Sequence, residues 1–138
     1  MFKELALQIA QKAHAGQVDK AGKDYILHPM TVASYMDTDI EKTIAYLHDV
    51  LEDTDVTVDA LRKIFPNEIV DTLITLTHRK DESYFEYIQR VSTSKLAKKI
   101  KVADLLHNLD ITRIKEPTKQ DYERLEKYKK AILYLTTH

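Results

Sequence analysis

Four chemically active side chains stand close together in the segment YLHDVLEDTD, residues 46–55. His48 and Asp49 are adjacent, and Glu52 and Asp53 follow them at a spacing of four residues. Because residues four apart on a helix share a face, this spacing predicts that all four lie on one helical stripe. The three carboxylates, so close together beside an imidazole, repel one another unless a divalent cation joins them. The segment therefore indicates a metal site, and the alternative is a solvated acidic helix face.

A metal site needs ligands from further elements, and two other segments offer them. KVADLLHN, residues 101–108, places Lys101, Asp104 and Asn108 on one helical stripe. An ionised Asp104 in this apolar helix is costly unless it is paired, so it is either a metal ligand or the partner of Lys101 in a structural ion pair. His28 precedes Pro29 at a loop–helix junction and is either a ligand or a capping or core residue.

Basic residues gather near these segments. Lys20 and Lys23 flank Gly22, and Lys101 belongs to a lysine-rich stretch at the start of a long predicted helix. Solubility alone explains several lysines. A carboxylate-rich metal centre beside lysines nevertheless suits an anionic substrate that carries phosphate.

The elements that must position these side chains are helices. The chain has 138 residues but only two glycines and three prolines, which speaks against a β-sandwich or β-barrel with many turns. Apolar stripes and breaks predict about eight helices, over 2–15, 29–36, 39–51, 57–65, 67–78, 83–91, 94–106 and 118–135. The predicted N-caps are Asp39, Thr57, Asn67, Ser83, Ser94 and Thr118. We expect an all-α bundle in which Gly16 and Gly22 bracket one special loop.

Composition excludes several classes of protein. With no cysteine, the chain has no disulfide scaffold, thiol nucleophile or cysteine-ligated metal, and it is compatible with a reducing cytosol. No run approaches the roughly 18 apolar residues of a membrane span. A net charge of −1 gives no electrostatic footprint for nucleic acid. We therefore expect a cytoplasmic protein with no nucleic-acid or membrane partner; the pattern does not indicate an oligomeric state.

Three blocks together carry a specific family resemblance. AHAGQVDKAGKDYILHP (13–29), YLHDVLEDTD (46–55) and KVADLLHN (101–108) resemble the HD superfamily of metal-dependent phosphohydrolases, and within it the hydrolase domains of RelA/SpoT-type enzymes and the small alarmone hydrolases. The resemblance covers residues 6 to about 114. It implies an all-α, single-domain HD-type bundle of about eight helices over 1–138.

The resemblance also implies a site and a reaction. One Mn²⁺ ion would be held by four ligands, with two paired catalytic carboxylates and a phosphorylated nucleotide as substrate. The implied ligands are His28, His48, Asp49 and Asp104, and the implied catalytic residues are Glu52 and Asp53. Lys20 and Asn108 match positions near the nucleotide and its phosphates, to which we add Lys23 and Lys101 as candidate substrate-binding lysines. The implied reaction is hydrolysis of the 3′-pyrophosphate of (p)ppGpp with release of pyrophosphate.

Three positions depart from the family pattern. Asp19 stands where the family usually has an arginine that packs on guanine, and Asp110 and Ile111 replace the usual Arg-Thr. The metal and carboxylate residues are intact, whereas the substrate-reading residues are only partly so. The alternatives are an HD phosphatase that acts on another nucleotide or dinucleotide phosphate ester, and a non-catalytic HD regulatory module.

Overall fold

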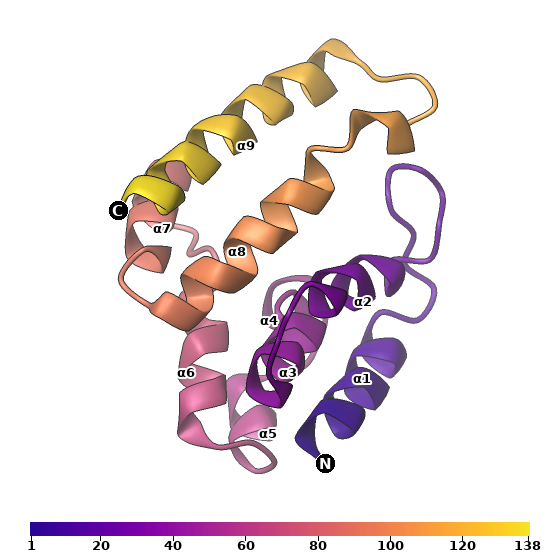
Figure 1. Cartoon of the computed structure of the whole chain (residues 1–138). Coiled ribbons are helices and arrows are strands. Elements are labelled where there is room, and N and C mark those ends of the chain that lie inside the picture. The colour runs from indigo at the N-terminus through magenta and orange to yellow at the C-terminus, as the bar shows by residue number, and fades with distance from the viewer.

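Helices make up the regular structure of the chain in the computed structural model shown in Figure 1. The structure describes residues 1–138, apart from the side chain of Ile111. The helices are α1 (Phe2–Ala13), α2 (Leu27–Ser34), α3 (Asp39–Leu47), α4 (Val50–Asp53), α5 (Val58–Arg62), α6 (Asn67–Thr75), α7 (Tyr84–Val91), α8 (Lys95–Asn108), the 3₁₀ helix η1 (Ile111–Arg113) and α9 (Lys119–Thr137). Among the described residues the one β-bridge joins Val18 to Asp24, so the predicted all-α class is confirmed.

Helix α3 lies at the centre of the fold. It packs against α1, α2, α6 and α8, and its inward face, with Ile44, Ala45 and Leu47, is fully buried. These residues continue the apolar stripe that predicts the helix. Since His48 follows directly on Leu47, the packing of α3 fixes the position of the first site residue.

Four of the six predicted N-caps are confirmed, and two are wrong. Thr57, Ser83, Ser94 and Thr118 each accept a hydrogen bond from the backbone N–H three residues later. Helix α3 is capped by Thr38 rather than Asp39, because Thr38 forms a reciprocal capping box with Glu41. Pro66 is the N-cap of α6, and the Asn67 side chain instead accepts a bond from Arg62 Nη1.

The predicted helix over 39–51 is interrupted at its functional residues. Helix α3 ends at Leu47 and α4 begins at Val50, so His48 and Asp49 lie in a turn between them. The prediction that all four active side chains share one continuous helical stripe is therefore wrong. The His48 ring explains part of the break, because its Nδ1 hydrogen-bonds the carbonyl of Ala45 at 2.6 Å.

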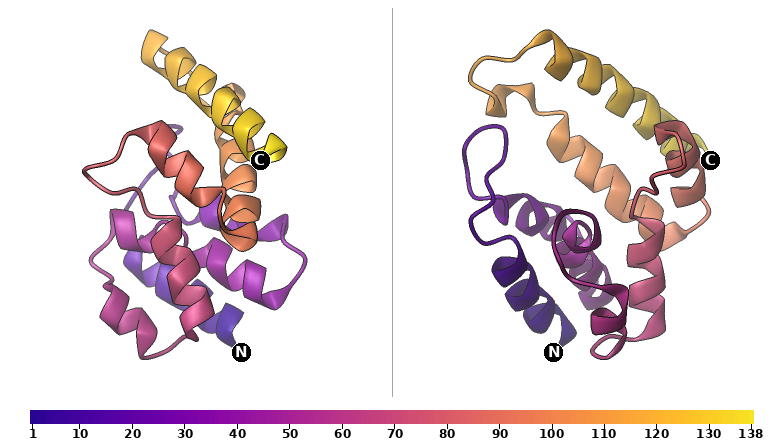
Figure 2. Two further views of the ribbon diagram at one scale, coloured as in Figure 1. Left: turned by 90° about the vertical axis from the view of Figure 1, so that its left-hand side faces the viewer. Right: turned by 180° about the vertical axis from the view of Figure 1, so that it is seen from behind.

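Helix α8 separates two parts of the molecule. In both the front and rear views α8 lies between α9 on one side and α1, α2 and α3 on the other (Figures 1 and 2). Helix α9 contacts α8 and α7. The loop over 14–26 reaches the segment after α8, where Asp19 pairs with Arg113 at 3.0 Å. Within the described residues, no helix combines the length and the apolar character needed to cross a membrane.

Both glycines of this loop adopt a backbone conformation that other residues avoid. Gly16 has φ of 85° and Gly22 has φ of 80°, and a Cβ built on either would meet nothing within 4 Å. The requirement for glycine is therefore conformational rather than steric.

Replacing Gly22 with alanine is expected to lower the free energy of unfolding by about 1 kcal/mol, because a Cβ disfavours the left-handed region. Urea denaturation of the purified protein measures this change. Gly22→Asn is the matched control and should cost less, since asparagine enters this region more readily. A Gly22→Ala protein at least as stable as the original would contradict the assignment of positive φ.

Candidate metal centre and adjoining pockets

Three buried side chains from separate elements meet at one point. His28 comes from α2, His48 from the turn after α3, and Asp104 from the middle of α8, and each is 4% exposed. One donor atom from each lies within 4.8 Å of the other two. His28 Nε2 is 2.7 Å and His48 Nε2 is 3.4 Å from the same oxygen, Oδ1 of Asp104. This grouping fits a divalent cation, which nitrogen and oxygen donors bind.

The His48 ring is oriented with one nitrogen free. Its Nδ1 donates to the Ala45 carbonyl at 2.6 Å, so Nε2 is the nitrogen that faces the carboxylates and would offer its lone pair to a cation. Burial lowers the pKa of His48, but the charges of Asp49 and Asp104 outweigh it and hold the pKa well above its usual range, so the metal-free ring is protonated. Nε2 is buried and has no hydrogen-bond partner among the described residues. A buried polar atom without a partner is costly, and a cation between His48, Asp49 and Asp104 would satisfy it.

Asp49 lies beside the same histidines. Its Oδ2 is 3.1 Å from His48 Nε2 and 3.9 Å from His28 Nε2, and it accepts a 2.5 Å hydrogen bond from the Tyr25 hydroxyl. Burial alone would raise the pKa of Asp49, but the charge of His48 outweighs it and lowers the pKa to about 2. Asp49 is therefore ionised and adds negative charge to the group.

Asp104 forms the ion pair with Lys101 that the sequence offers as one of its two roles, and it also contacts the buried histidines. Its Oδ2 accepts from Lys101 Nζ at 2.9 Å, and its Oδ1 contacts His28 and accepts from Asn108 Nδ2 at 3.2 Å. Burial favours the neutral acid, but Lys101 outweighs it and holds the pKa of Asp104 well below its usual range. The ion pair with Lys101 thus keeps a buried carboxylate charged while its other oxygen faces the histidines.

The two carboxylates of α4 stand at the edge of this group. Glu52 Oε1 accepts from the backbone N–H of His78 at 2.9 Å. The backbone of Asp53 is held by Gln17, whose Nε2 donates to the Asp53 carbonyl at 3.0 Å. Partial enclosure, followed by the charges of Asp49 and Glu52, raises the pKa of Asp53 to about 6. Asp53 therefore gains and loses its proton close to neutral pH.

Two adjoining pockets open at this centre. The metal pocket has a volume of about 210 Å³ and is lined by five of the predicted metal-binding and catalytic residues, together with the predicted substrate-binding residues Lys101 and Asn108. Those five are His48, Asp49, Glu52, Asp53 and Asp104. The outer pocket, of about 320 Å³, lies between the 14–26 loop, η1 and α9 and includes Lys20, His28, Arg113 and Arg124. Tyr25, Asn108 and Tyr128 line both pockets, so the two are continuous.

Of the two predicted substrate-binding lysines in the 14–26 loop, Lys20 lines a pocket and Lys23 does not. Lys20 lines the outer pocket, and its Nζ lies 3.3 Å from Asp121 Oδ1. Lys23 is exposed and lines neither pocket, so the structure does not bring its side chain to the others. Its binding role stays a prediction.

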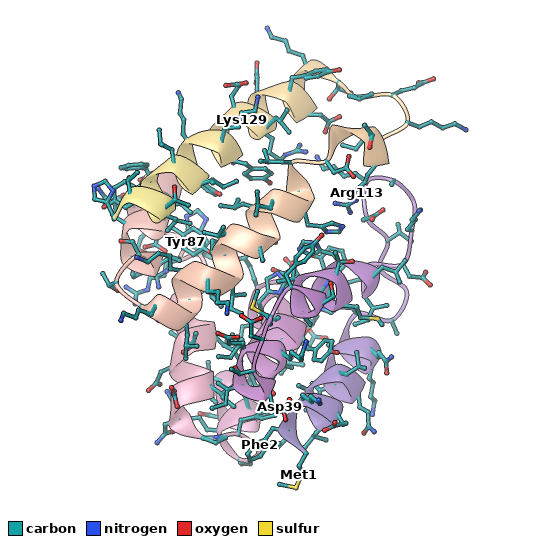
Figure 3. The ribbon with its side chains drawn as sticks, viewed as in Figure 1. Met1, Phe2, Asp39, Tyr87, Arg113 and Lys129 are labelled. Carbon is teal, nitrogen blue, oxygen red and sulfur yellow. The ribbon has the colours of Figure 1, made fainter. Side chains whose placement is uncertain are left out.

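The departures from the family pattern also lie at the outer pocket. Asp19 lines it and pairs with Arg113, and Asp110 lines it while hydrogen-bonding Thr112. The side chain of Ile111 lies outside the described part of the chain. Arg113 projects from η1 toward the 14–26 loop (Figure 3). The guanidinium of Arg113, in the segment that follows α8, therefore lines the outer pocket, although residue 19 is an aspartate.

Sequence reasoning assigned no role to several residues that line or support the site, among them Tyr25, Tyr84, Tyr128, His107 and Arg113. Tyr25 stands three residues before His28, and that spacing was the available signal. The ring of His107 lies edge to edge with that of His28, with ring centroids 4.9 Å apart. Burial, then the charge of Arg113, lowers the pKa of His107 to about 4, so its ring is neutral.

The comparisons with known proteins agree with this geometry. A family model described as "HD domain" matches residues 6–127. The guanosine-3′,5′-bis(diphosphate) 3′-pyrophosphohydrolase of Borreliella burgdorferi is 35% identical over 132 residues, which cover 84% of this chain and 20% of that protein. A probable GTP pyrophosphokinase of Mycobacterium leprae is 32% identical, over 83% of this chain and 16% of that protein. The chain thus spans a fifth or less of the length of these curated relatives.

A solved structure gives the same result for the fold. It is that of a metazoan SpoT orthologue described as hydrolysing ppGpp, and it matches with a TM-score of 0.83 and 25% sequence identity. The match covers 97% of this chain and 84% of that one. Fold, buried His/His/Asp group and sequence matches agree, and the chain belongs to the HD domain family, in the branch related to the SpoT and RelA ppGpp hydrolase domains.

Proposed function

We propose that this chain is a metal-dependent hydrolase that removes the 3′-pyrophosphate from ppGpp or a related 3′-pyrophosphorylated nucleotide. The observation that carries the proposal is the unpartnered Nε2 of His48, buried between two ionised carboxylates and beside the open carboxylates of α4. The similarity to ppGpp-hydrolysing relatives supports the choice of substrate. We take residues 1–138 to form one HD hydrolase domain.

His28, His48, Asp49 and Asp104 would hold one divalent ion, and we infer Mn²⁺. Two imidazoles and two carboxylates, with no sulfur, form a donor set that suits Mn²⁺. A divalent ion in this position acidifies water and offsets negative charge on phosphoryl oxygens. Tyr25 orients Asp49 through its 2.5 Å hydrogen bond, and Lys101 keeps Asp104 ionised.

The two carboxylates of α4 would manage the proton of the attacking water. As the water oxygen bonds to the phosphorus next to the ribose, its proton passes to Asp53. The bond between that phosphorus and the 3′ oxygen breaks, pyrophosphate leaves, and the proton taken up by Asp53 would return to the ribose 3′ oxygen, which regenerates the base. Glu52, held by the backbone of His78, would orient the water.

The rest of the substrate would occupy the outer pocket. Tyr25 and Tyr128 join the two pockets, so a nucleoside in one can place its phosphates in the other. Asn108 stands at the same junction and offers an amide for hydrogen bonds. Lys20, Lys101 and the more distant Lys23 would offset phosphate charge.

The charge balance of the outer pocket favours a second candidate. Its three acids, Asp19, Asp110 and Asp121, equal its basic side chains in number, and a lining without net positive charge suits a substrate with fewer phosphates at that end. This candidate is an HD phosphatase acting on another nucleotide or dinucleotide phosphate ester.

A product-resolved screen tests the proposal. The purified chain with Mn²⁺ is incubated with ppGpp, pppGpp, nucleoside monophosphates and NADPH, and the products are separated by anion exchange. Pyrophosphate release from ppGpp is expected, and Asp53→Asn serves as the matched inactive control. Release of orthophosphate from another ester, without pyrophosphate, would favour the second candidate. Absence of turnover with every substrate and divalent metal would point to a non-catalytic module.

A further inference from the structure

Two histidine rings, those of His28 and His107, share a proton at the candidate metal centre. Nδ1 of His28 and Nδ1 of His107 lie 2.7 Å apart, and the planes of the two rings are nearly parallel, at an angle of 15°. Two nitrogens approach this closely only when one of them donates a proton to the other. Which ring carries the proton decides which nitrogen of His28 is free on its opposite side.

Arg113 decides the direction of this hydrogen bond. Its Nη1 donates to the carbonyl of His107 at 3.0 Å and lies 3.4 Å from His107 Nδ1. A guanidinium only donates, so a proton on His107 Nδ1 would face a second donor there. His107 Nδ1 is therefore the acceptor, and His28 carries its proton on Nδ1.

This tautomer leaves the lone pair of His28 on Nε2. That nitrogen lies 2.7 Å from Asp104 Oδ1, which also only accepts. A lone pair and a carboxylate oxygen at this separation need a positive charge between them. The proton on Nδ1 of His28 thus leaves Nε2 of the same ring free to bind a cation.

Asp19 in turn fixes the position of Arg113. Its Oδ2 pairs with Arg113 Nη2 at 3.0 Å, and its Oδ1 accepts from the backbone N–H of Ala21 at 2.8 Å and of Lys23 at 3.0 Å. The carboxylate is fixed by its own loop, so it can orient the guanidinium. Asp19, which departs from the family pattern, therefore pairs with Arg113 and orients its guanidinium.

We propose that His107 is a positioning residue that fixes the metal-binding tautomer of His28, and that Arg113 and Asp19 keep His107 in its accepting state. The inference rests on the proposed metal role of His28 and extends it from the metal pocket to the loop of the outer pocket. Metal-binding histidines commonly donate their other ring N–H to an acceptor, and loss of that acceptor weakens metal binding about 10- to 100-fold.

Metal affinity is the direct measurement. We expect His107→Phe to weaken Mn²⁺ binding about 10- to 100-fold in EPR titrations of the purified full chain, since phenylalanine keeps the ring but removes the acceptor. His107→Asn should restore most of the affinity, because its amide oxygen lies at nearly the same place on the side chain as Nδ1. Asp19→Asn should weaken binding less than His107→Phe. His138→Phe, at the far end of the chain, is the matched control and should bind like the original.

The tautomer itself is visible by NMR. With histidine labelled in ¹⁵N and Zn²⁺ as a diamagnetic ion, His28 should show a proton on Nδ1 and none on Nε2. A folded His107→Phe protein with unchanged Mn²⁺ affinity, or a His28 proton on Nε2, would overturn the inference. A chain that shows both expected results but cleaves no nucleotide would contradict the proposed function alone.

Discussion

Asp104→Asn is expected to remove divalent-metal binding and nucleotide hydrolysis together. Asp104 contacts both histidines of the buried group through one oxygen, at 2.7 Å from His28 and 3.4 Å from His48. Loss of an indirect partner of a metal ligand already costs about 10- to 100-fold in affinity. Loss of the ligand's own charge should therefore cost more than about 100-fold, measured as the Mn²⁺ dissociation constant and as kcat for ppGpp.

The same substitution also weakens the fold, which needs its own control. Lys101 loses its counter-charge in a buried position, and breaking a buried pair costs about 3–5 kcal/mol. The double variant Lys101→Met/Asp104→Asn removes both charges and should recover stability without recovering metal binding. Asp59→Asn, which removes an exposed acid of α5, is the matched control for the loss of one carboxylate. Original Mn²⁺ affinity in Asp104→Asn would exclude this residue from the metal site.

Local patterns in the sequence predicted most of the helices and offered candidates for the metal site, whereas the set of four ligands followed only from the resemblance to the HD superfamily. Apolar stripes, breaks and capping residues act over a few positions, so they are readable without the fold. The pairing of Asp104 with Lys101 was also readable, because the two stand three residues apart on one helix. The turn at His48 and Asp49 could not be predicted from the spacing of the side chains. The hydrogen bond from His48 Nδ1 to the Ala45 carbonyl depends on how the folded chain orients the His48 ring.

The contacts of the outer pocket could not be predicted in this way. Asp19 and Arg113 are 94 residues apart, and His28 and His107 are 79 apart. Their meeting depends on how α8 packs on α2 and on where η1 ends, which no local period encodes. Comparison with the family pattern indicated that position 19 lacks the usual arginine. It could not indicate that another arginine, Arg113 of η1, approaches Asp19 in the folded chain.

Asp53→Asn is expected to lower kcat about 10²- to 10⁴-fold, the usual worth of a general base, while leaving Mn²⁺ affinity close to that of the original chain. Partial enclosure and the neighbouring charges of Asp49 and Glu52 raise the pKa of Asp53 to about 6, which suits proton exchange near neutral pH. Glu52→Gln is the comparison, because its amide oxygen can keep the bond to His78. Equal losses in the two variants would assign the proton to neither carboxylate alone.

The pH dependence of rate and of stability separates this role from a structural one. A base must be ionised, and a bound cation lowers its pKa, so the rate should fall tenfold per unit on an acid limb at or below about pH 6. In metal-free protein, the folded state binds the Asp53 proton more tightly than the unfolded chain, whose pKa is near 3.8. Stability therefore falls as pH rises from about 4 to about 6 and stays lower above that range.

Asp53→Asn removes this loss. Thermal unfolding with EDTA should show the variant more stable than the original at pH 7, with the difference vanishing below about pH 4. A gain of stability with a loss of rate is expected of a carboxylate kept at a cost for its chemistry, whereas a structural carboxylate would lose both. Asp53→Asn that unfolds at a lower temperature at pH 7 would show that Asp53 supports the fold and would leave Glu52 as the base.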